Sequence, residues 1–265
     1  MGFFDKLFGS NQQTAPASPA PSQTPADKAR GVYEEGVRLI ARGQAREGLQ
    51  RFVDAVKIDP GCVDAHIAFA SAFCQIDRVA HSDVILSSTK AALAVDPKNA
   101  KALNIASVTH FALGQQAWDA EKWAEATASF QTAYSLDPEG QHVAEALAFC
   151  AEQASVLEDV LPAFEQRLAT NPTDARAQYI AGRSYIKLAM NGESATSGFS
   201  TEKALQRGEQ HLREVLRSSP SHSEANYWLG GAYLMAGRDA EALEIINLLR
   251  SVDPEKAAEL EELRQ

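Results

Sequence analysis

The sequence predicts an all-α protein, a solenoid built from antiparallel helix pairs. Proline follows an apolar, helix-like stretch at fairly even intervals, and strands have no clear signal. Because the residue before a proline is pushed out of helical space, each of these prolines marks the end of a helix. The spacings of 37, 41, 34, 48 and 34 residues indicate a repeat with insertions. The six dipeptides are Asp59-Pro60, Asp96-Pro97, Asp137-Pro138, Asn171-Pro172, Ser219-Pro220 and Asp253-Pro254.

The clearest helix pair spans residues 223–254 and is hinged at Gly237. Its first helix carries L-G-x-x-Y from Leu229 to Tyr233, which puts a large, a small and an aromatic residue at helical spacing. A lone pair of helices cannot bury its apolar face, so further pairs should stack on this one. In the second helix that face is built at steps of four and three by Ala242, Ile246 and Leu249.

This stretch resembles the tetratricopeptide repeat, whose signature is L-G-x-x-Y, then A-x-x-x-F, then P, with a period of 34 residues. It departs from that signature at Asn226, where the family often has Trp, and at Ile246, where it often has Phe. The resemblance covers about 85 per cent of the chain and implies a right-handed superhelical solenoid with a capping helix over residues 255–265. Six repeats are expected, at 27–60, 61–97, 98–138, 139–172, 173–220 and 221–254.

The first two repeats follow the signature to different degrees. Gly36 and Phe52 fall on family positions in the first. The second is degenerate, with Ile85 and Thr89 in place of the usual small residue and Phe. Small residues let the two helices of a pair approach closely, and the aromatic residue fills the space between pairs. One position recurs in the second helix of several repeats and is expected to be buried between helix pairs. It is occupied by Phe52, Phe130 and Phe164.

The third repeat exceeds the period by seven residues, which is about two helical turns. One turn added to each helix would keep the packing faces aligned, so a long helix pair is expected here. Trp118 and Trp123 would lie near its tip, where packing within the pair is favoured over an exposed docking site. The fourth repeat has the standard length. The fifth carries the largest insertion, residues 191–200, in which Ser200 or the following Thr201 is suited to cap the next helix.

Residues 1–26 are predicted to form a flexible head. Nine residues are too few for a stable isolated helix in water, and residues 10–26 have the Pro, Ser and Ala content of a flexible linker. The alternatives for residues 1–9 are binding to a membrane surface, binding in a partner's groove, and a frayed tail. Their apolar helical face consists of Phe3, Phe4, Leu7 and Phe8.

Composition and charge argue against several other classes. The net charge of −10 disfavours an electrostatic nucleic-acid binder, because phosphate binding needs clustered Lys and Arg. No apolar run approaches the roughly 20 residues of a membrane span. No secretory signal is expected at the N-terminus, because its apolar stretch is too short and Asp5 interrupts it. A cytoplasmic protein is expected, peripheral at the membrane if residues 1–9 bind there. Buried apolar thiols in a reducing compartment are expected for Cys62, Cys74 and Cys150.

No familiar catalytic or cofactor motif is present. The sequence lacks a P-loop, a dinucleotide-binding glycine motif, H-E-x-x-H and a G-x-S-x-G elbow. The six histidines are scattered, and none pairs with another at the spacing that brings two metal ligands to one helix face. We therefore assign no catalytic residue, cofactor or metal. An enzyme with an unrecognised groove site is the least favoured function.

The resemblance also implies where a partner binds, because the first helices of successive repeats line a concave groove in this family. Lys101 and Asn104 are similar to part of a clamp for a terminal carboxylate, but the full pattern is missing, so no specificity for chaperone tails is assigned. Counted in register from the prolines, the partner-binding groove includes Arg30, Tyr33, Lys101, Asn104, Arg176, Tyr179, Arg183, Lys187 and Tyr227.

A cationic stripe stands out within this groove. Arg176, Arg183 and Lys187 are separated by 7 and 4 residues and share one helix face. One reading is an anchor for an acidic segment or a C-terminal carboxylate, with Tyr179 as an aromatic wall. The other is internal neutralisation by Glu145, Glu152 and Glu224.

The expected function is a non-enzymatic protein–protein interaction scaffold that binds a peptide or helical segment in the groove. The alternative is a peripheral membrane adaptor that is anchored by its N-terminal segment and recruits other proteins. The sequence does not identify the partner in either case.

Overall fold

The computed structural model describes residues 24–140, 142–192 and 200–265, and the regular structure of these ranges is entirely α-helical. This confirms the predicted all-α helical array. The chain divides into two compact units, Met1–Phe69 and Ala70–Gln265, and the division falls inside α3. The helices are α1 (Pro25–Ala41), α2 (Ala45–Ile58), α3 (Val63–Asp77), α4 (Ser82–Val95), α5 (Ala100–Asp119), α6 (Trp123–Leu136), α7 (Val143–Gln153), α8 (Leu157–Thr170), α9 (Ala175–Met190), α10 (Thr201–Ser218), α11 (Ser223–Met235), α12 (Asp239–Val252) and α13 (Pro254–Arg264).

Every predicted X-Pro boundary is a helix end. The residue before each proline is the C-cap of its helix, with φ between −125° and −152°. This extended backbone is what the proline ring imposes on its predecessor. Pro254 then begins α13, at a position where a missing N–H is tolerated. The division of the chain into six repeats stays a prediction.

In the first unit, α1 and α2 form an antiparallel pair. Gly36 and Phe52 face one another so closely that a Cβ added at Gly36 would lie 2.7 Å from the phenyl ring. Only glycine permits this approach, and Phe52 is buried as predicted. A small alanine cluster completes the packing of this unit, made of Ala29, Ala55 and Ala65.

The start of α1 corrects the predicted linker boundary. The helix begins at Pro25 rather than Asp27, because the Thr24 hydroxyl accepts a hydrogen bond from the Asp27 backbone N–H while the Asp27 carboxylate accepts one from the Thr24 N–H. This reciprocal capping box satisfies two free donors at the helix start. Residues 1–23 lie outside the described residues, and so does the predicted amphipathic face of residues 1–9.

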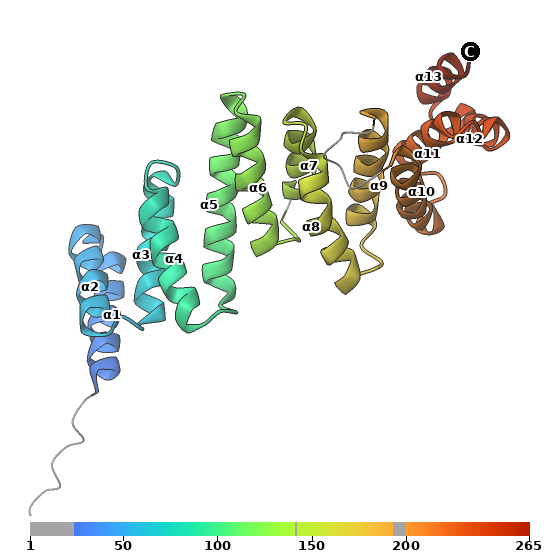
Figure 1. The fold of residues 1–265 in the computed structure, drawn as a ribbon. Coiled ribbons are helices and arrows are strands. Elements are labelled where there is room, and N and C mark those ends of the chain that lie inside the picture. The colour runs from blue at the N-terminus through green and yellow to red at the C-terminus, as the bar shows by residue number, and fades with distance from the viewer. Residues whose placement is uncertain (1–23, 141, 193–199) are drawn as a thin grey trace, which may run out of the picture. The chain divides into compact units, whose positions relative to one another are not determined.

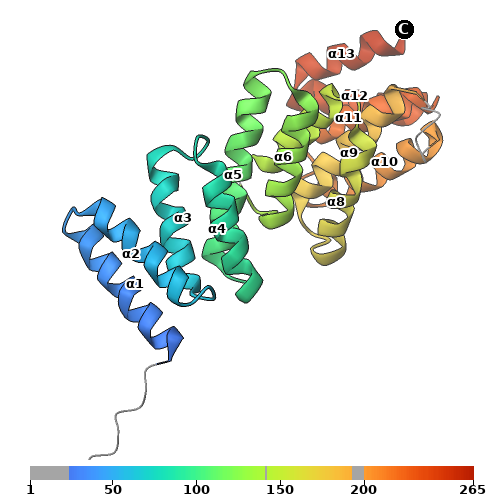
Figure 2. The same ribbon diagram turned by 60° about the vertical axis from the view of Figure 1, so that its left-hand side comes forward.

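In the second unit, antiparallel helix pairs pack on one another in chain order. The pairs α5/α6, α9/α10 and α11/α12 are each in contact, and α6 packs on α7, α10 on α11 and α12 on α13 (Figure 1). Phe130 and Phe164 are fully buried, which confirms the predicted burial at this position. Phe164 meets Tyr134 of the preceding pair, whereas Phe130 packs on Phe111 and Trp118 of its own pair. At the C-terminal end, α13 lies alongside α11 and α12 (Figure 2).

The prediction of one extra turn in each helix of the third pair is wrong. α5 has 20 residues and α6 has 14, while α11 and α12 have 13 and 14. The first helix therefore takes all seven additional residues. The stacking residue Phe130 lies eight positions before Pro138, as Phe52 does before Pro60. α2 and α6 also begin at the same distance before this Phe, at Ala45 and Trp123, so the second helix gains no turn.

The tip of this long pair is an aromatic cluster. The Trp118 and Trp123 rings lie 6.1 Å apart, which confirms packing within the pair. Trp118 also stacks on Phe149 of α7, with ring centroids 4.6 Å apart. The extra length of α5 is thus held by the next helix pair as well as by its own.

The predicted cap of the fifth pair is also present. The Ser200 hydroxyl accepts a hydrogen bond from the Lys203 backbone N–H and starts α10. Most of the predicted loop, residues 193–199, lies outside the described residues.

Candidate functional site

Four helices of the second unit lie side by side. α7 contacts α9, α9 contacts α11, and α11 contacts α13. We call the surface formed by these four helices the odd-helix face. Five of the nine predicted groove residues are on it, because Arg176, Tyr179, Arg183 and Lys187 belong to α9 and Tyr227 to α11.

At the α7 end, Arg176 forms a two-point ion pair with Glu145. The guanidinium Nε donates to Oε1 at 2.6 Å, and Nη2 donates to Oε2. Burial disfavours ionisation of Glu145, but the hydrogen bonds from Arg176 outweigh it and lower the pKa of this carboxyl. The same hydrogen bonds raise the pKa of Arg176. Paired Arg–carboxylate bonds of this kind combine charge with fixed geometry.

The other two cations of the stripe share one carboxylate. Lys187 Nζ lies 2.8 Å from one Glu152 oxygen, and Arg183 Nη2 lies 3.5 Å from the other. Both cations also lie over the Trp228 ring, with Lys187 Nζ 5.2 Å and Arg183 Cζ 5.8 Å from its centroid. A cation over an indole face is attracted by the ring quadrupole. Two positive charges therefore lie over this ring and share one negative charge.

Glu224 does not neutralise the stripe as one reading of the sequence supposed. Its carboxylate lies 3.0 Å from Lys256 Nζ of α13, and Lys256 also pairs with Asp253 at 3.0 Å. Both carboxylates hold the pKa of Lys256 above its ordinary value. Lys256 reaches Glu224 because α13 packs against α11. The sequence register compared only α9 and α11, so it did not predict this partner.

Two tyrosines complete the odd-helix face. The half-buried Tyr179 ring lies 5.3 Å from the His222 ring, and burial raises the pKa of its hydroxyl. The Tyr227 ring meets Trp228 edge-on at 5.6 Å, and burial together with a hydrogen bond to Glu259 raises its pKa. Both hydroxyls have hydrogen-bond partners within the protein, so these residues offer a ligand mainly the apolar area of their rings.

Two of the remaining predicted groove residues are in the second unit but outside this cluster. Lys101 and Asn104 are exposed on α5, where Phe111, Trp118 and His142 line a separate hollow of about 740 Å³ between α5 and α7. The other two predicted groove residues are on α1 of the first unit: Arg30, which is exposed, and Tyr33, which packs on Phe52.

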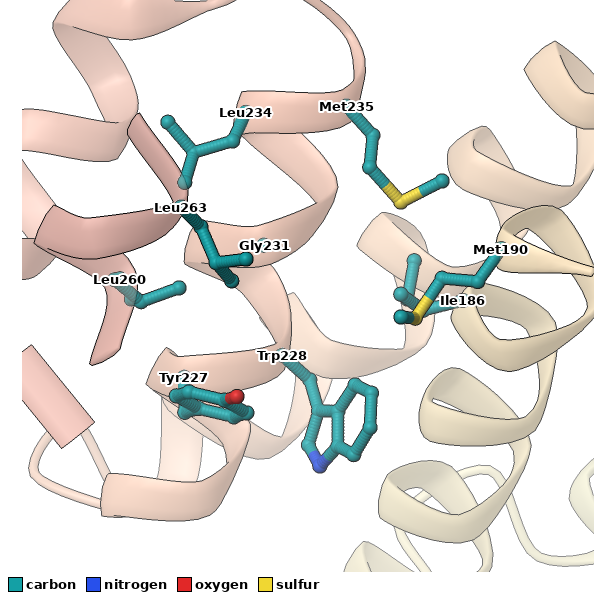
Figure 3. A pocket seen from close by; sticks show the side chains of 9 residues that line it. All are labelled: Ile186, Met190, Tyr227, Trp228, Gly231, Leu234, Met235, Leu260 and Leu263. Carbon is teal, nitrogen blue, oxygen red and sulfur yellow. The ribbon is translucent and has the colours of Figure 1, made fainter. Parts of the chain in front are cut away.

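Sequence reasoning missed an apolar pocket on the odd-helix face. It has a volume of about 270 Å³ and lies between α9, α11 and α13 (Figure 3). The sequence prediction selected a few fixed positions on the first helix of each repeat. Trp228 is not at one of these positions, although it lines the pocket and lies beneath the two cations. The pocket is lined by Ile186, Met190, Tyr227, Trp228, Gly231, Leu234, Met235, Leu260 and Leu263.

A buried polar cluster behind this face was also missed. His211 of α10 is buried, with Nδ1 2.6 Å from Gln178 Oε1 and Nε2 3.2 Å from Glu165 Oε1. Tyr185 donates a hydrogen bond to the same Glu165 oxygen at 2.8 Å. These side chains come from α8, α9 and α10, and each satisfies the others, which is the condition for burying polar groups. This hydrogen-bond network links α8, α9 and α10 and has a structural role.

We also searched the described ranges for metal sites, membrane-spanning helices and reactive thiols. No three His, Cys, Asp or Glu side chains there gather as metal ligands would, and no described helix has the length and apolarity to cross a bilayer. The thiol of Cys150 is buried, and burial raises its pKa to about 11. Cys62 and Cys74 are only half-buried, so the prediction of buried thiols holds for Cys150 alone.

Comparisons with known proteins place the C-terminal part of the chain in a family. Residues 201–265 match the tetratricopeptide repeat. No curated protein matches the chain in sequence. Among solved structures, YrrB, described as a tetratricopeptide-repeat protein with an unusual peptide-binding site, is 19% identical over 80% of this chain and 97% of its own, with a TM-score of 0.49.

Two further solved structures are similarly distant. PilF of Pseudomonas aeruginosa is 19% identical over 89% of this chain and 98% of its own, with a TM-score of 0.40. MamA from Desulfovibrio magneticus RS-1 is 16% identical over 89% of this chain and 96% of its own, with a TM-score of 0.37. At this level of similarity, the ligands of these proteins cannot be assigned to this chain.

Proposed function

We propose that this chain, which matches the tetratricopeptide repeat over residues 201–265, is a non-enzymatic scaffold that binds a segment of another protein on the odd-helix face. Binding is non-covalent. The segment carries carboxylates, from acidic side chains or from a chain terminus, that meet the cations of α9.

One observation carries this proposal: Arg183 and Lys187 share the single carboxylate of Glu152. Each of these three side chains keeps between 21% and 27% of its surface exposed, so a ligand can reach them. A second carboxylate brought by a partner would complete the pairing. Charge pairs of this kind set orientation and association rate as well as affinity.

The test uses Glu152→Gln, which keeps the shape of the side chain and removes its charge. If the cations serve a partner, this variant should bind an acidic partner more tightly than the wild type, because the internal competitor is gone. Arg183→Ala combined with Lys187→Ala should weaken the same binding by about 2 kcal/mol or more. The partner is isolated by affinity capture from native extract with the full chain, and its affinity is then measured by titration calorimetry.

The matched control is Glu214→Gln on α10, whose carboxylate pairs with Arg217 one turn away in the same helix. It changes the same net charge and should leave partner affinity unaltered. If Glu152→Gln weakens binding or has no effect, the pairing is purely structural and the partner binds elsewhere. A full chain that captures no protein would contradict the scaffold function itself.

A further inference from the structure

The pocket between α9, α11 and α13 has a closed floor and an open rim. Ile186 and Leu260 are fully buried at its base. At its rim, Met190 is 57% exposed, Met235 42% and Leu263 67%. Figure 3 shows Met190 and Met235 extending toward one another across the opening, with the Trp228 ring below them. Three large apolar side chains thus remain in solvent around one depression, which is typical of a binding site.

Two neighbouring glycines of α11 distinguish the packed side of the helix from the open side. A Cβ added at Gly230 would lie 2.6 Å from Leu260 Cδ1, so this side is closed by α13. A Cβ added at Gly231 would meet no atom within 4 Å. Since Gly231 lines the pocket, the space above it is available to a ligand.

The rim also carries positive charge. Trp228 lines the pocket with its indole, and Lys187 and Arg183 lie over that same ring. These are the two cations that share Glu152. Adjacent residues of a peptide are separated by about 3.8 Å at Cα, so a ligand residue in the pocket places its neighbour within reach of Lys187.

We propose that this pocket anchors a short peptide segment with one large apolar side chain, phenylalanine, leucine or methionine, next to an aspartate or glutamate. The apolar side chain enters between Met190, Met235 and Leu263, and the carboxylate pairs with Lys187 and Arg183. Methionine side chains are flexible and polarisable, so the rim adapts to each of these three residues. This inference rests on the proposed function and specifies which partner segments the odd-helix face accepts.

The probe is a fluorescein-labelled peptide with one phenylalanine between two aspartates, and its binding to the full chain is followed by fluorescence anisotropy. Replacing the phenylalanine by alanine should weaken binding about tenfold or more, as for a central anchor residue. Replacing both aspartates by asparagine should weaken binding to the wild type, and should have a smaller effect on Lys187→Gln, which has lost the complementary charge.

The pocket itself is tested with Gly231→Leu, because an added Cβ there meets nothing within 4 Å and the rest of the side chain would occupy the pocket. This variant should lose about tenfold or more in probe affinity. Gly31→Leu is the matched control, because Gly31 is also inside a helix, α1, and an added Cβ there also meets nothing within 4 Å. It should bind the probe as the wild type does. Equal probe affinity of the Gly231→Leu and wild-type proteins would overturn the inference.

Other occupants give different results. If sedimentation shows that the wild type self-associates and Gly231→Leu is monomeric, the occupant is a second copy of this chain. If the protein binds vesicles of anionic phospholipid through this pocket and not the peptide, the occupant is a lipid surface. Either result overturns the peptide assignment. If the peptide probe does not bind while Glu152→Gln still binds a captured partner more tightly than the wild type, the peptide assignment is wrong. The proposed scaffold function is then still supported.

Discussion

At the scale of single residues, close approach between a glycine and a large side chain holds helix pairs together. Gly114 of α5 faces Phe130 of α6 so closely that an added Cβ would lie 2.8 Å from the ring. Phe130 also meets Phe111 and Trp118, with ring centroids 5.2 Å and 6.3 Å away. The first helix therefore closes over the ring that the second helix supplies.

Phe130→Ala should lower the free energy of unfolding by about 3–5 kcal/mol, because it removes buried apolar area and leaves a cavity that the flanking glycine cannot fill. Urea unfolding followed by circular dichroism measures this. The comparison is Leu248→Ala, at a position that is 39% exposed, which should have a much smaller effect. A loss under about 1 kcal/mol for Phe130→Ala would contradict its place in the core.

At the scale of helices, neighbouring elements are locked by polar contacts as well as by apolar packing. His211 of α10 meets Gln178 of α9 and Glu165 of α8, so three consecutive helices converge on one buried ring. Gln178 in turn donates a hydrogen bond to the Pro172 carbonyl at 2.9 Å. The loop between α8 and α9 is thereby tied to the same cluster.

His211→Leu should destabilise the protein by about 1–3 kcal/mol, because Gln178 and Glu165 lose a buried hydrogen-bond partner. Gln178→Leu should destabilise it for the same reason. Denaturant unfolding of both single variants and of the double variant gives the coupling between them, which should be about 0.5–3 kcal/mol for residues in one network. If the two effects simply add, the hydrogen bond does not link these helices.

At the scale of the whole molecule, the charge and the ionisable groups are unevenly placed. The chain has 35 acidic and 25 Lys and Arg residues. Four of those basic residues lie on the odd-helix face of the second unit, each paired with an acidic side chain: Arg176, Arg183, Lys187 and Lys256. Neutral, titratable hydroxyls are distributed over both units. Burial raises the pKa of Tyr33, Tyr134, Tyr179, Tyr185 and Tyr227.

Stability should therefore fall in alkaline solution. Burial raises the pKa of Tyr134 from 10.0 to about 12 in the folded protein, so folding favours the protonated phenol. Its contribution is fully present below pH 10 and is lost as the pH rises toward 12. Unfolding midpoints in urea, measured across this range, should decrease.

Tyr134→Phe is the variant that isolates this effect, since it keeps the ring that packs on Phe164 and removes the hydroxyl. Its stability should depend less on pH above 10 than that of the wild type. An identical pH dependence in the two proteins would mean that Tyr134 is not the group responsible.

The sequence by itself determined the six helix ends at the X-Pro dipeptides, the fold class and the buried stacking positions. Each of these depends on interactions between residues close in the chain: a proline acts on its immediate neighbour, and the spacing from Phe130 to Pro138 sets the position of the ring within one helix. The cationic stripe of α9 was also predictable, because residues at steps of 7 and 4 share a face in any α-helix.

Only the tertiary structure decided how those faces meet. The length of α5, the pairing of Glu224 with Lys256 and the pocket around Gly231 all depend on the position of one helix against another. Side chains from helices such as α9 and α13 are far apart in sequence, and the angle between the helices comes from the combined packing of several pairs. No local pattern encodes that angle, so Trp228 and Met190 became recognisable as a site only once α13 was in place.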